Sequence, residues 1–509
     1  MGLCGADAHS HWRLRLLRKL RISCRALKVS KVSKALKDPK ALKVLKDPKD
    51  LKDLEDSQKK STVNQDLNKQ FHNYLWAYIL VALSGCLGNV VDGIIVGNLI
   101  SADGVSAINL SKPVNQFIYT LQLLINAGGG MLVAYALGKK DVREACRLFT
   151  RAFMLSLGAG VVLTIVGGIL FPEQTARLLC SNEHILPLAS DYMRILLLGN
   201  TAFILMWGLS TMVGVDGQPK LVSLAVIIDN AANLCLDIVF IQWFGWGIAG
   251  SSAATVVGHL IGIAILLSHW WKPKAKETDK TVQLALDFSI DGLMASWRRI
   301  ISQGAPLAIA SISLTLLLLS ANTIVLGTLG RTGIFAFAVC MNLLQVYNLF
   351  LSGTCQTLQS LGAIQVGKGD EAGLHLVLRK AFRFITIAMA VTCVFVWCFP
   401  SVIVRLFGAT DDTLVSEGNH ALRIFALSFI PFCYIYVLMI VYKLYHHHHM
   451  ALFISFALSL TVIPVLWIVA KWQPSALWYS YLIAYLIEAI AIFILHRATH
   501  VTFTHPKKT

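Results

Sequence analysis

Charged residues are scarce in this 509-residue chain. Asp, Glu, Lys and Arg make up 14% of it, whereas a soluble domain carries about a quarter. The mean hydropathy is +0.63, and the apolar residues come in repeated runs of about twenty, the length that crosses the hydrocarbon core of a bilayer. The composition therefore excludes a soluble globular protein and predicts an integral membrane protein with many spans.

Paired cysteines and the usual metal-binding motif are also missing. The eleven cysteines are scattered, mostly inside apolar runs, and no CxxC pair joins them. This pattern is typical of small buried hydrophobic residues and not of a disulfide framework or a zinc site. No HExxH motif indicates a metalloenzyme. We therefore expect neither an enzyme nor a resident cofactor.

Acidic residues are outnumbered by basic ones, and the excess is uneven. The net charge is +17, and residues 1–70 alone hold 18 Lys+Arg against 8 Asp+Glu. This segment repeats a KDPK-containing unit and is nearly free of aromatic residues, so it lacks the folded basic face with aromatic readers that binds nucleic acid. We predict a basic, low-complexity, disordered cytoplasmic tail over 1–70 and no nucleic-acid partner.

From residue 72 onward the hydropathy predicts twelve spans. They lie near 72–97, 107–137, 150–171, 188–213, 220–243, 248–270, 302–327, 335–360, 382–406, 420–444, 450–470 and 476–496. Loops on the side of the tail are richer in Lys and Arg than loops on the other side, which predicts that both termini are cytoplasmic.

These spans divide into two groups of six. We expect an N-terminal six-helix bundle over 71–270, a cytoplasmic linker with an interfacial helix over 271–300, a C-terminal six-helix bundle over 301–498 and a cytoplasmic tail over 499–509. The predicted fold class is thus an all-α integral membrane protein of twelve transmembrane helices.

An internal repeat relates the two groups. VDGIIVGNLI (91–100) aligns with ANTIVLGTLG (321–330), and GKKD (138–141) aligns with GKGD (367–370). Phe171-Pro172 recurs as Phe399-Pro400, and the spacing stays at 228 to 230 residues throughout. Because six spans separate equivalent positions, the halves have the same orientation and are related by a pseudo-symmetry axis along the membrane normal. Transporters built this way place the substrate site between the halves.

Ionisable residues within spans are functional candidates because each costs about 2.5–3.5 kcal/mol to insert. In the first half they are Asp92 in span 1, Asp229 and Asp237 in span 5 and His259 in span 6, with Asn233 and Thr255 on the same helix faces. Asp92, Asp237 and Thr255 fall at a similar depth in the outer half of the bundle.

These depths predict one cation-coupling site made of Asp92, Asn233, Asp237 and Thr255. Hard oxygen ligands suit Na⁺, and two carboxylates held close together also suit H⁺, so either ion fits. For Asn233 and Thr255 a purely structural role at a helix break stays open. Asp229 either lines the cavity or is incidental, and His259 is either a hydrogen-bonded core residue or a proton carrier.

The second half lacks this set of acids. Asp92 aligns with Asn322, and the span aligned with span 5 reads SLTVIPVLWIVAK. The remaining polar candidates there, assigned to a cavity wall, are Asn322, Asn342, Gln345, Gln356 and Gln359. Glu488 is a lone acid in span 12 without an assigned partner. Ion coupling is therefore predicted to be confined to the first half.

Four consecutive histidines, His446–His449, stand at the cytoplasmic end of span 10. Consecutive helical residues point in different directions, so they make a poor metal cage and are expected in an exposed loop.

At these residues the chain resembles the multidrug and toxic compound extrusion (MATE) family over 72–498. The resemblance is carried by NVVDGIIVG (89–97), Pro113, GVDGQPKL (214–221), NLCLDIVFI (233–241) and GWGIAGSSAATV (245–256). It implies the two-bundle fold and a cation site on Asp92, Asn233, Asp237 and Thr255. The second-half counterpart of GVDGQPK is VYKLYHHHH, which departs from the pattern by lacking its Gly and Pro.

The function implied is export of small organic, cationic or lipophilic compounds in exchange for Na⁺ or H⁺, by a monomer in the lipid of a bacterial cytoplasmic membrane. A lipid-linked sugar flippase remains an alternative, although it would need a cationic cavity for phosphate. A membrane-embedded metalloenzyme that uses His446–His449, and a channel, are further alternatives.

Overall fold

The computed structural model describes residues 48–100, 102–179, 186–271, 284–289, 291–407 and 411–498. Residues up to Leu67 and residues from Asn68 onward form separate units, and each is considered by itself. Most of the predicted disordered tail, residues 1–47, lies outside the described part. Residues 48–70 form the first part of helix α4. Pro48 stands at the first helical position, where its missing N–H is not needed, and no proline follows within the helix.

The first half of the chain contains α4 to α11. The elements are α4 (Pro48–Leu99), α5 (Ala102–Gln122), η1 (Leu123–Ala127), α6 (Gly128–Gly138), α7 (Val142–Leu163), η2 (Thr164–Leu170), α8 (Pro172–Leu179), α9 (Leu186–Val215), α10 (Pro219–Ile238), η3 (Val239–Trp243) and α11 (Gly247–Trp271).

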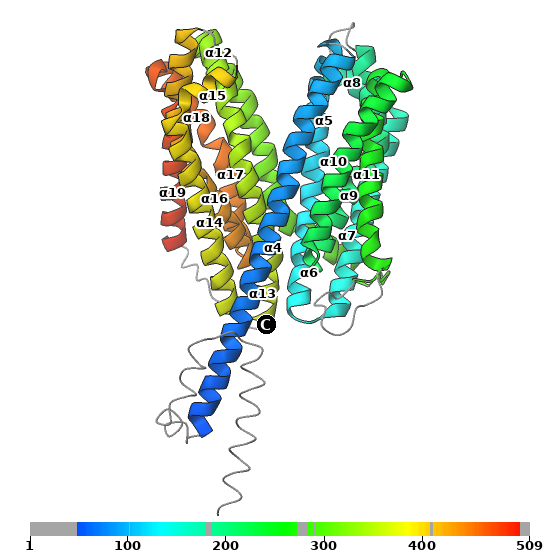
Figure 1. Ribbon diagram of the computed structural model, residues 1–509, viewed down its shortest axis with the longest axis vertical. Coiled ribbons are helices and arrows are strands. Elements are labelled where there is room, and N and C mark those ends of the chain that lie inside the picture. The colour runs from blue at the N-terminus through cyan, green and yellow to red at the C-terminus, as the bar shows by residue number, and fades with distance from the viewer. Residues whose placement is uncertain are drawn as a thin grey trace, which may run out of the picture. The chain divides into compact units, whose positions relative to one another are not determined.

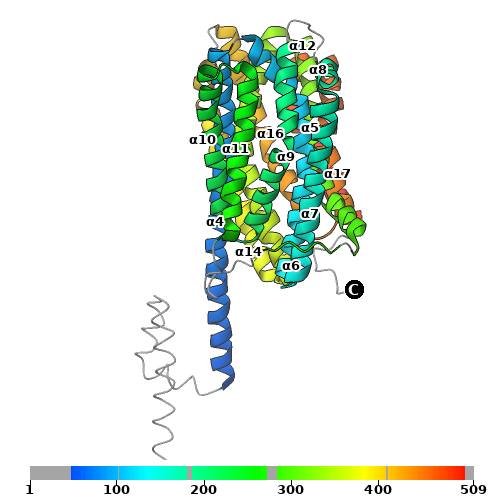
Figure 2. The same cartoon turned by 90° about the vertical axis from the view of Figure 1, so that its right-hand side faces the viewer.

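The second half contains α12 to α19. The elements are α12 (Leu293–Thr357), η4 (Leu358–Gly362), α13 (Ala363–Lys368), α14 (Glu371–Cys398), α15 (Pro400–Leu406), α16 (Asp412–Leu444), α17 (His448–Leu460), α18 (Val462–Trp472), η5 (Pro474–Ala476) and α19 (Tyr479–Ala498). Figure 1 shows the two halves as two groups of helices that converge at one end and diverge toward the other, and Figure 2 shows the helices aligned along the long axis.

Ten helical stretches in the described residues are long and apolar enough to cross a membrane. One of them, residues 293–368, bends at Gly330, whose φ of 63° breaks the helix, so it holds two of the predicted spans. The predicted first span lies within α4. The helical architecture therefore agrees with the twelve predicted spans.

The repeat seen in the sequence recurs in the local backbone. Asp141 accepts a hydrogen bond from the Glu144 backbone N–H at the start of α7, and Asp370 accepts one from the Gly373 N–H at the start of α14. Both contacts are N-caps of the helix that follows the GKKD or GKGD motif. The Phe-Pro pairs likewise open two short equivalent helices, α8 and α15.

The halves meet through α6 and α13, at the end that carries the turns after Gly138 and Lys368, here named the closed end. A Cβ on Gly138 would overlap the Ile364 carbonyl oxygen and approach Gly367 Cα to 2.8 Å, and a Cβ on Gly367 would overlap the Tyr135 carbonyl oxygen. Gly138 and Gly367 are equivalent residues of the repeat. The pseudo-symmetry axis thus passes between two glycines whose backbones touch.

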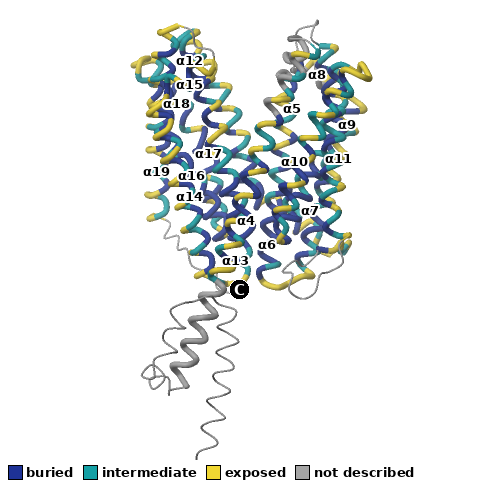
Figure 3. Tube along the Cα trace, in the orientation of Figure 1, coloured by how far each residue is buried: buried dark blue, intermediate teal, exposed yellow. Residues whose placement is uncertain are grey.

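Polar contacts between the halves extend from the closed end toward the middle of the molecule. The Tyr135 hydroxyl of α6 donates to two backbone carbonyl oxygens at the end of α16. Its Oη lies 3.1 Å from the Lys443 oxygen and 3.2 Å from the Leu444 oxygen. Farther along, Tyr78 Oη and Ser360 Oγ are 3.2 Å apart. Figure 3 shows buried residues within each half and where the halves converge. Moving the halves apart at this end requires breaking these contacts.

The linker between the halves differs from its prediction. Residues 284–289 are not helical, and the helix begins only at Leu293 and continues into α12. The reason is that side chains of the first half take the backbone N–H groups of the linker. Ala285 N–H donates to Cys146 Sγ at 3.3 Å, and Asp287 N–H donates to Thr150 Oγ1 at 2.7 Å.

Large apolar side chains are exposed at both ends of the molecule. Trp243 and Trp472 lie at the end opposite the closed end and are 77% and 86% exposed, while Trp271 at the closed end is 77% exposed. Tryptophan is enriched where a membrane meets water, and the surface between these positions carries exposed Leu, Ile, Val and Phe. The outer surface therefore suits a lipid environment.

Candidate functional site

The predicted cation-coupling residues lie on α4, α10 and α11. Asp237 stands in the last turn of α10, just before the chain passes into the π-helix η3. Its carboxylate is fully buried, and neither of its oxygens meets hydrogen-bond geometry with a partner in the described residues. A buried carboxylate with free lone pairs can accept a cation or a proton.

Asp92 of α4 faces this carboxylate. The two aspartates interact electrostatically, and Ser251 Oγ of α11 donates to Asp92 Oδ1 at 3.4 Å. Like charges held together in a low-dielectric region repel each other, so the pair is stable when a cation or a proton is shared between them.

Asn233 and Thr255 complete the predicted set. Asn233 Nδ2 donates to Thr255 Oγ1 at 3.1 Å, and Thr255 Oγ1 donates to the Ser251 carbonyl oxygen at 3.2 Å. The hydrogen bond from Asn233 to Thr255 joins α10 to α11, and it leaves the Asn233 side-chain oxygen available as a ligand. The structure therefore brings Asn233 against Thr255 and Asp92 against Asp237 on three adjacent helices.

Sequence reasoning missed two residues of this cluster. Ser251 joins Asp92 and stands one turn before Thr255, so the i, i+4 rule could have found it. Tyr192 of α9 is buried and interacts with both aspartates. No spacing rule links Tyr192 to the other residues, because it comes from a helix without a buried acid at that depth.

Asp229 and His259 form a separate layer of the first half. His259 Nδ1 lies 3.0 and 3.1 Å from the two carboxylate oxygens of Asp229, which is 5% exposed. Gly258 leaves room for this aspartate, because a Cβ there would come within 2.7 Å of Asp229 Oδ1. These two candidates pair with each other, two turns of α10 away from Asp237.

The polar candidates of the second half do not form an equivalent cluster. Asn322 and Gln345 are exposed, and Gln356 donates to Ser352 one turn earlier at 3.2 Å. At the positions equivalent to Asn233, Asp237 and Thr255 the second half has Val462, Leu466 and Ala484, all buried. The structure thus places the clustered carboxylate, amide and hydroxyl side chains in the first half.

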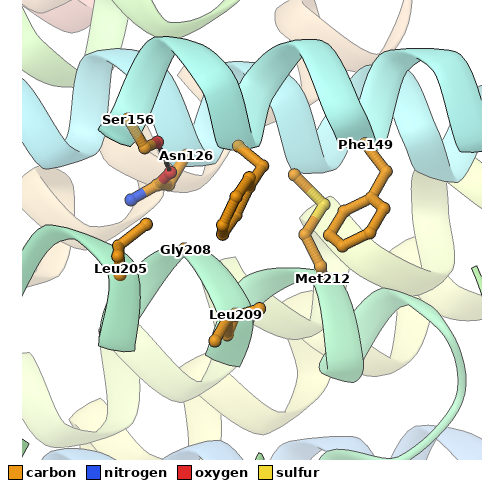
Figure 4. Close-up of a pocket in the computed structure, with 8 residues that line it drawn as sticks. Asn126, Phe149, Ser156, Leu205, Gly208, Leu209 and Met212 are labelled. Atoms are coloured by element: carbon orange, nitrogen blue, oxygen red, sulfur yellow. Dashed lines mark hydrogen bonds between the residues drawn. The ribbon is translucent and has the colours of Figure 1, made fainter. Parts of the chain in front are cut away.

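A small pocket of the first half, shown in Figure 4, lies away from these acids. It is lined mainly by apolar residues of α7 and α9, with Asn126 and Ser156 as its polar members. Ser156 Oγ donates to Asn126 Oδ1 at 2.8 Å, and Asn126 Nδ2 donates to the Ile204 carbonyl oxygen at 3.1 Å. These polar groups have partners, so the pocket offers little to a charged ligand.

His446 and His447 lie in the turn between α16 and α17, whereas His448 and His449 begin α17 instead of lying in a loop. His446 has a φ of 62°, and its ring lies 4.7 Å from that of Tyr135. In the described residues no group of three or more His, Cys, Asp or Glu side chains is arranged to hold a metal ion.

Comparisons with known proteins agree with this architecture. The family model MatE matches the chain twice, over residues 78–239 and 306–468, which is one match for each half. The chain is 23% identical to the probable multidrug resistance protein YoeA of Bacillus subtilis, over 70% of this chain and 77% of that protein. It is 22% identical to the multidrug export protein MepA of Staphylococcus aureus, over 68% of this chain and 76% of that protein.

Solved structures show the same fold. One described as the outward-facing conformation of a multidrug resistance MATE family transporter of the MOP superfamily has a TM-score of 0.75 at 18% identity, covering 85% of this chain and 96% of that chain. A MOP superfamily transporter from Pyrococcus furiosus has a TM-score of 0.74 at 18% identity with the same coverage.

Proposed function

Since this chain belongs to the MatE family, we propose that it is a multidrug exporter that moves small organic, cationic or lipophilic compounds out of the cell in exchange for Na⁺ or H⁺. The similarity to the export protein MepA and to YoeA supports the export of drugs. The setting is a bacterial cytoplasmic membrane, with the chain acting as a monomer and both termini on the cytoplasmic side.

One observation supports the ion coupling: Asp92 and Asp237 interact with each other, and the Asp237 carboxylate is fully buried. Neutral side chains would pack at these positions at lower cost, as Leu466 does in the second half. The coupling ion binds between these carboxylates, with oxygens of Asn233 and Thr255 as further ligands when the ion is Na⁺.

The transport cycle follows from the contacts between the halves. The halves touch at the closed end through α6 and α13, and their helices diverge toward the opposite end (Figure 1). Binding of the ion at Asp92 changes the packing of α4 against α10 and α11, and this competes with substrate held between the halves. Rocking of the halves about the closed end then gives alternating access.

Uptake of ethidium, a lipophilic monocation, into inverted vesicles tests the coupling under separately imposed Na⁺ and pH gradients. Asp92→Asn should lower gradient-driven transport by about tenfold or more, because it removes a charge that the ion must neutralise. Asp291→Asn, the same change at an exposed linker position, is the matched control. Normal ion-driven uptake by vesicles containing Asp92→Asn, with equal amounts of inserted protein, would refute the proposed site.

A further inference from the structure

The second half contains a buried acid that the proposed ion site does not use. Glu488 of α19 is 1% exposed, and neither of its carboxylate oxygens has a hydrogen-bond partner in the described residues. An acid at this depth is costly, and a nearby base would reduce the cost.

The repeat explains why Glu488 stands alone. Trp243 ends η3 and Trp472 ends α18, which fixes the spacing of the two halves at 229 residues in this region. At that spacing Glu488 is equivalent to His259, and Leu458 is equivalent to Asp229. The first half therefore has a His–Asp pair in this layer, whereas the second half has an acid whose partner position holds a leucine that is 2% exposed.

Charged side chains on the helices around Glu488 lie at the helix ends. α19 packs against α16, α17 and α18. Their charged and histidine residues fall in the first three turns of α16, from Asp412 to Arg423, or in the terminal turns of the three helices, at Lys443, His448, His449 and Lys471. On α19 itself, His496 and Arg497 stand in the last turn, and His496 Nδ1 lies 3.0 Å from Tyr442 Oη.

Among the described residues, Tyr485 interacts with Glu488. Tyr485 lies one turn earlier on α19 and also interacts with Tyr481 and with Cys433 of α16. Both tyrosines line an apolar cavity together with Phe425, Phe429 and Phe432, and Tyr481 Oη has no partner in the described residues. The hydroxyls follow one face of α19 from Glu488 toward the end opposite the closed end.

The surroundings of Glu488 favour a proton over a metal cation. A metal cation needs several oxygen ligands, and Leu458 occupies the position from which a second carboxylate would come. A proton needs only one carboxylate oxygen, and the neutral acid so formed is the state compatible with apolar surroundings. We propose that Glu488 takes up and releases one proton in each transport cycle, so that the second half has a proton site of its own.

This proposal rests on the proposed function as an ion-coupled exporter. In the state described here the carboxyl group holds the proton, and it returns the proton to water when the rocking of the halves opens the core around α19. The step forms and breaks one O–H bond and requires no other reactant.

The test is the number of protons exchanged per ethidium, obtained from reversal potentials in liposomes containing the purified full chain. Glu488→Gln should lower this number by one while ethidium transport continues, and Glu488→Asp should restore it. Glu371→Gln, at an exposed position of the same half, should leave it unchanged. Melting temperatures of all variants identify any that fail to fold.

The two hypotheses fail in different ways. If the wild-type protein transports ethidium with ion coupling and Glu488→Gln exchanges the same number of protons, the Glu488 site is refuted and the exporter stands. If the wild-type protein shows no ion-coupled transport, the proposed function itself fails. Should Glu488→Gln not fold, Leu458→Asn supplies a hydrogen-bond partner for the carboxylate, and an unchanged pH dependence of transport in that variant would also overturn the proposal.

Discussion

The two halves are most alike in their backbone and least alike in their polar residues. The turn after α6 has Lys140 in the left-handed region and its counterpart has Gly369, with φ of 62° and 69°. At the turn after α9 the exchange is reversed, because Gly217 has a φ of 93° and its counterpart His446 one of 62°. Both halves therefore have the left-handed residue at both turns. At each turn only one half has the glycine that favours this conformation.

The buried polar residues, in contrast to the backbone, differ between the two halves. Asp237 in the first half corresponds to Leu466 in the second, and both side chains are buried in the same structural position. The leucine shows that the fold can form with an apolar residue there. The acid therefore costs stability, and its presence in only one half points to function.

Placing an acid at the equivalent position of the second half is expected to have the largest effect. Leu466→Asp should destabilise the protein by about 3 kcal/mol or more, because the second half has no Asn233–Thr255 pair to receive the carboxylate. The yield of monodisperse protein and its melting temperature report the loss. Leu466→Asn should lower both less, and equal effects of the two variants would show that the position is sensitive only to shape.

The contact between Gly138 and Gly367 comes next in expected size. Gly138→Ala should cost about 1–3 kcal/mol, because its Cβ must push α13 away from α6 at the closed end. Thermal melting and ethidium efflux should both decline. Gly158→Ala in α7 is the matched control, since a Cβ there meets nothing within 4 Å and alanine favours the helix by about 1 kcal/mol. A stabilised Gly138→Ala variant would contradict the close approach.

The left-handed turns give the smallest effects and the finest comparison. Lys140→Gly should stabilise by about 0.5–1 kcal/mol, because it removes the steric cost of a side chain at positive φ. His446→Gly should gain less, because it also removes the ring that packs on Tyr135. Chemical or thermal unfolding of the two variants measures the difference. A larger gain from His446→Gly than from Lys140→Gly would show that the ring contact contributes nothing.

The sequence predicted the fold well because hydropathy and a steady repeat spacing report directly on spans and symmetry. It also grouped Asp92 with Asp237, because depth along a helix follows from residue counting. The rotation of one helix about its axis relative to another does not follow from residue counting. The pairing of Asp229 with His259 and the interaction of Tyr192 with the two aspartates therefore appear only in the three-dimensional structure.

Two other predictions failed or fell short for local reasons. The linker segment 284–289 has helical periodicity, yet side chains of α7 take its backbone donors, and no sequence pattern reveals that competition. Glu488 was recognised as an isolated acid, but the leucine at its partner position became evident only when the helix ends fixed the register of the last spans.

The Gly138–Gly367 contact also bears on how the two halves can diverge. Away from the axis, a residue and its repeat counterpart meet different neighbours, so each half is free to change alone, as Asp237 and Leu466 have done. At the axis the counterparts are each other's neighbours, and a larger residue in one is felt at once by the other. After a gene duplication, such a pair is expected to drift more slowly than the rest of the chain, as a fixed mark of the joint between two former copies.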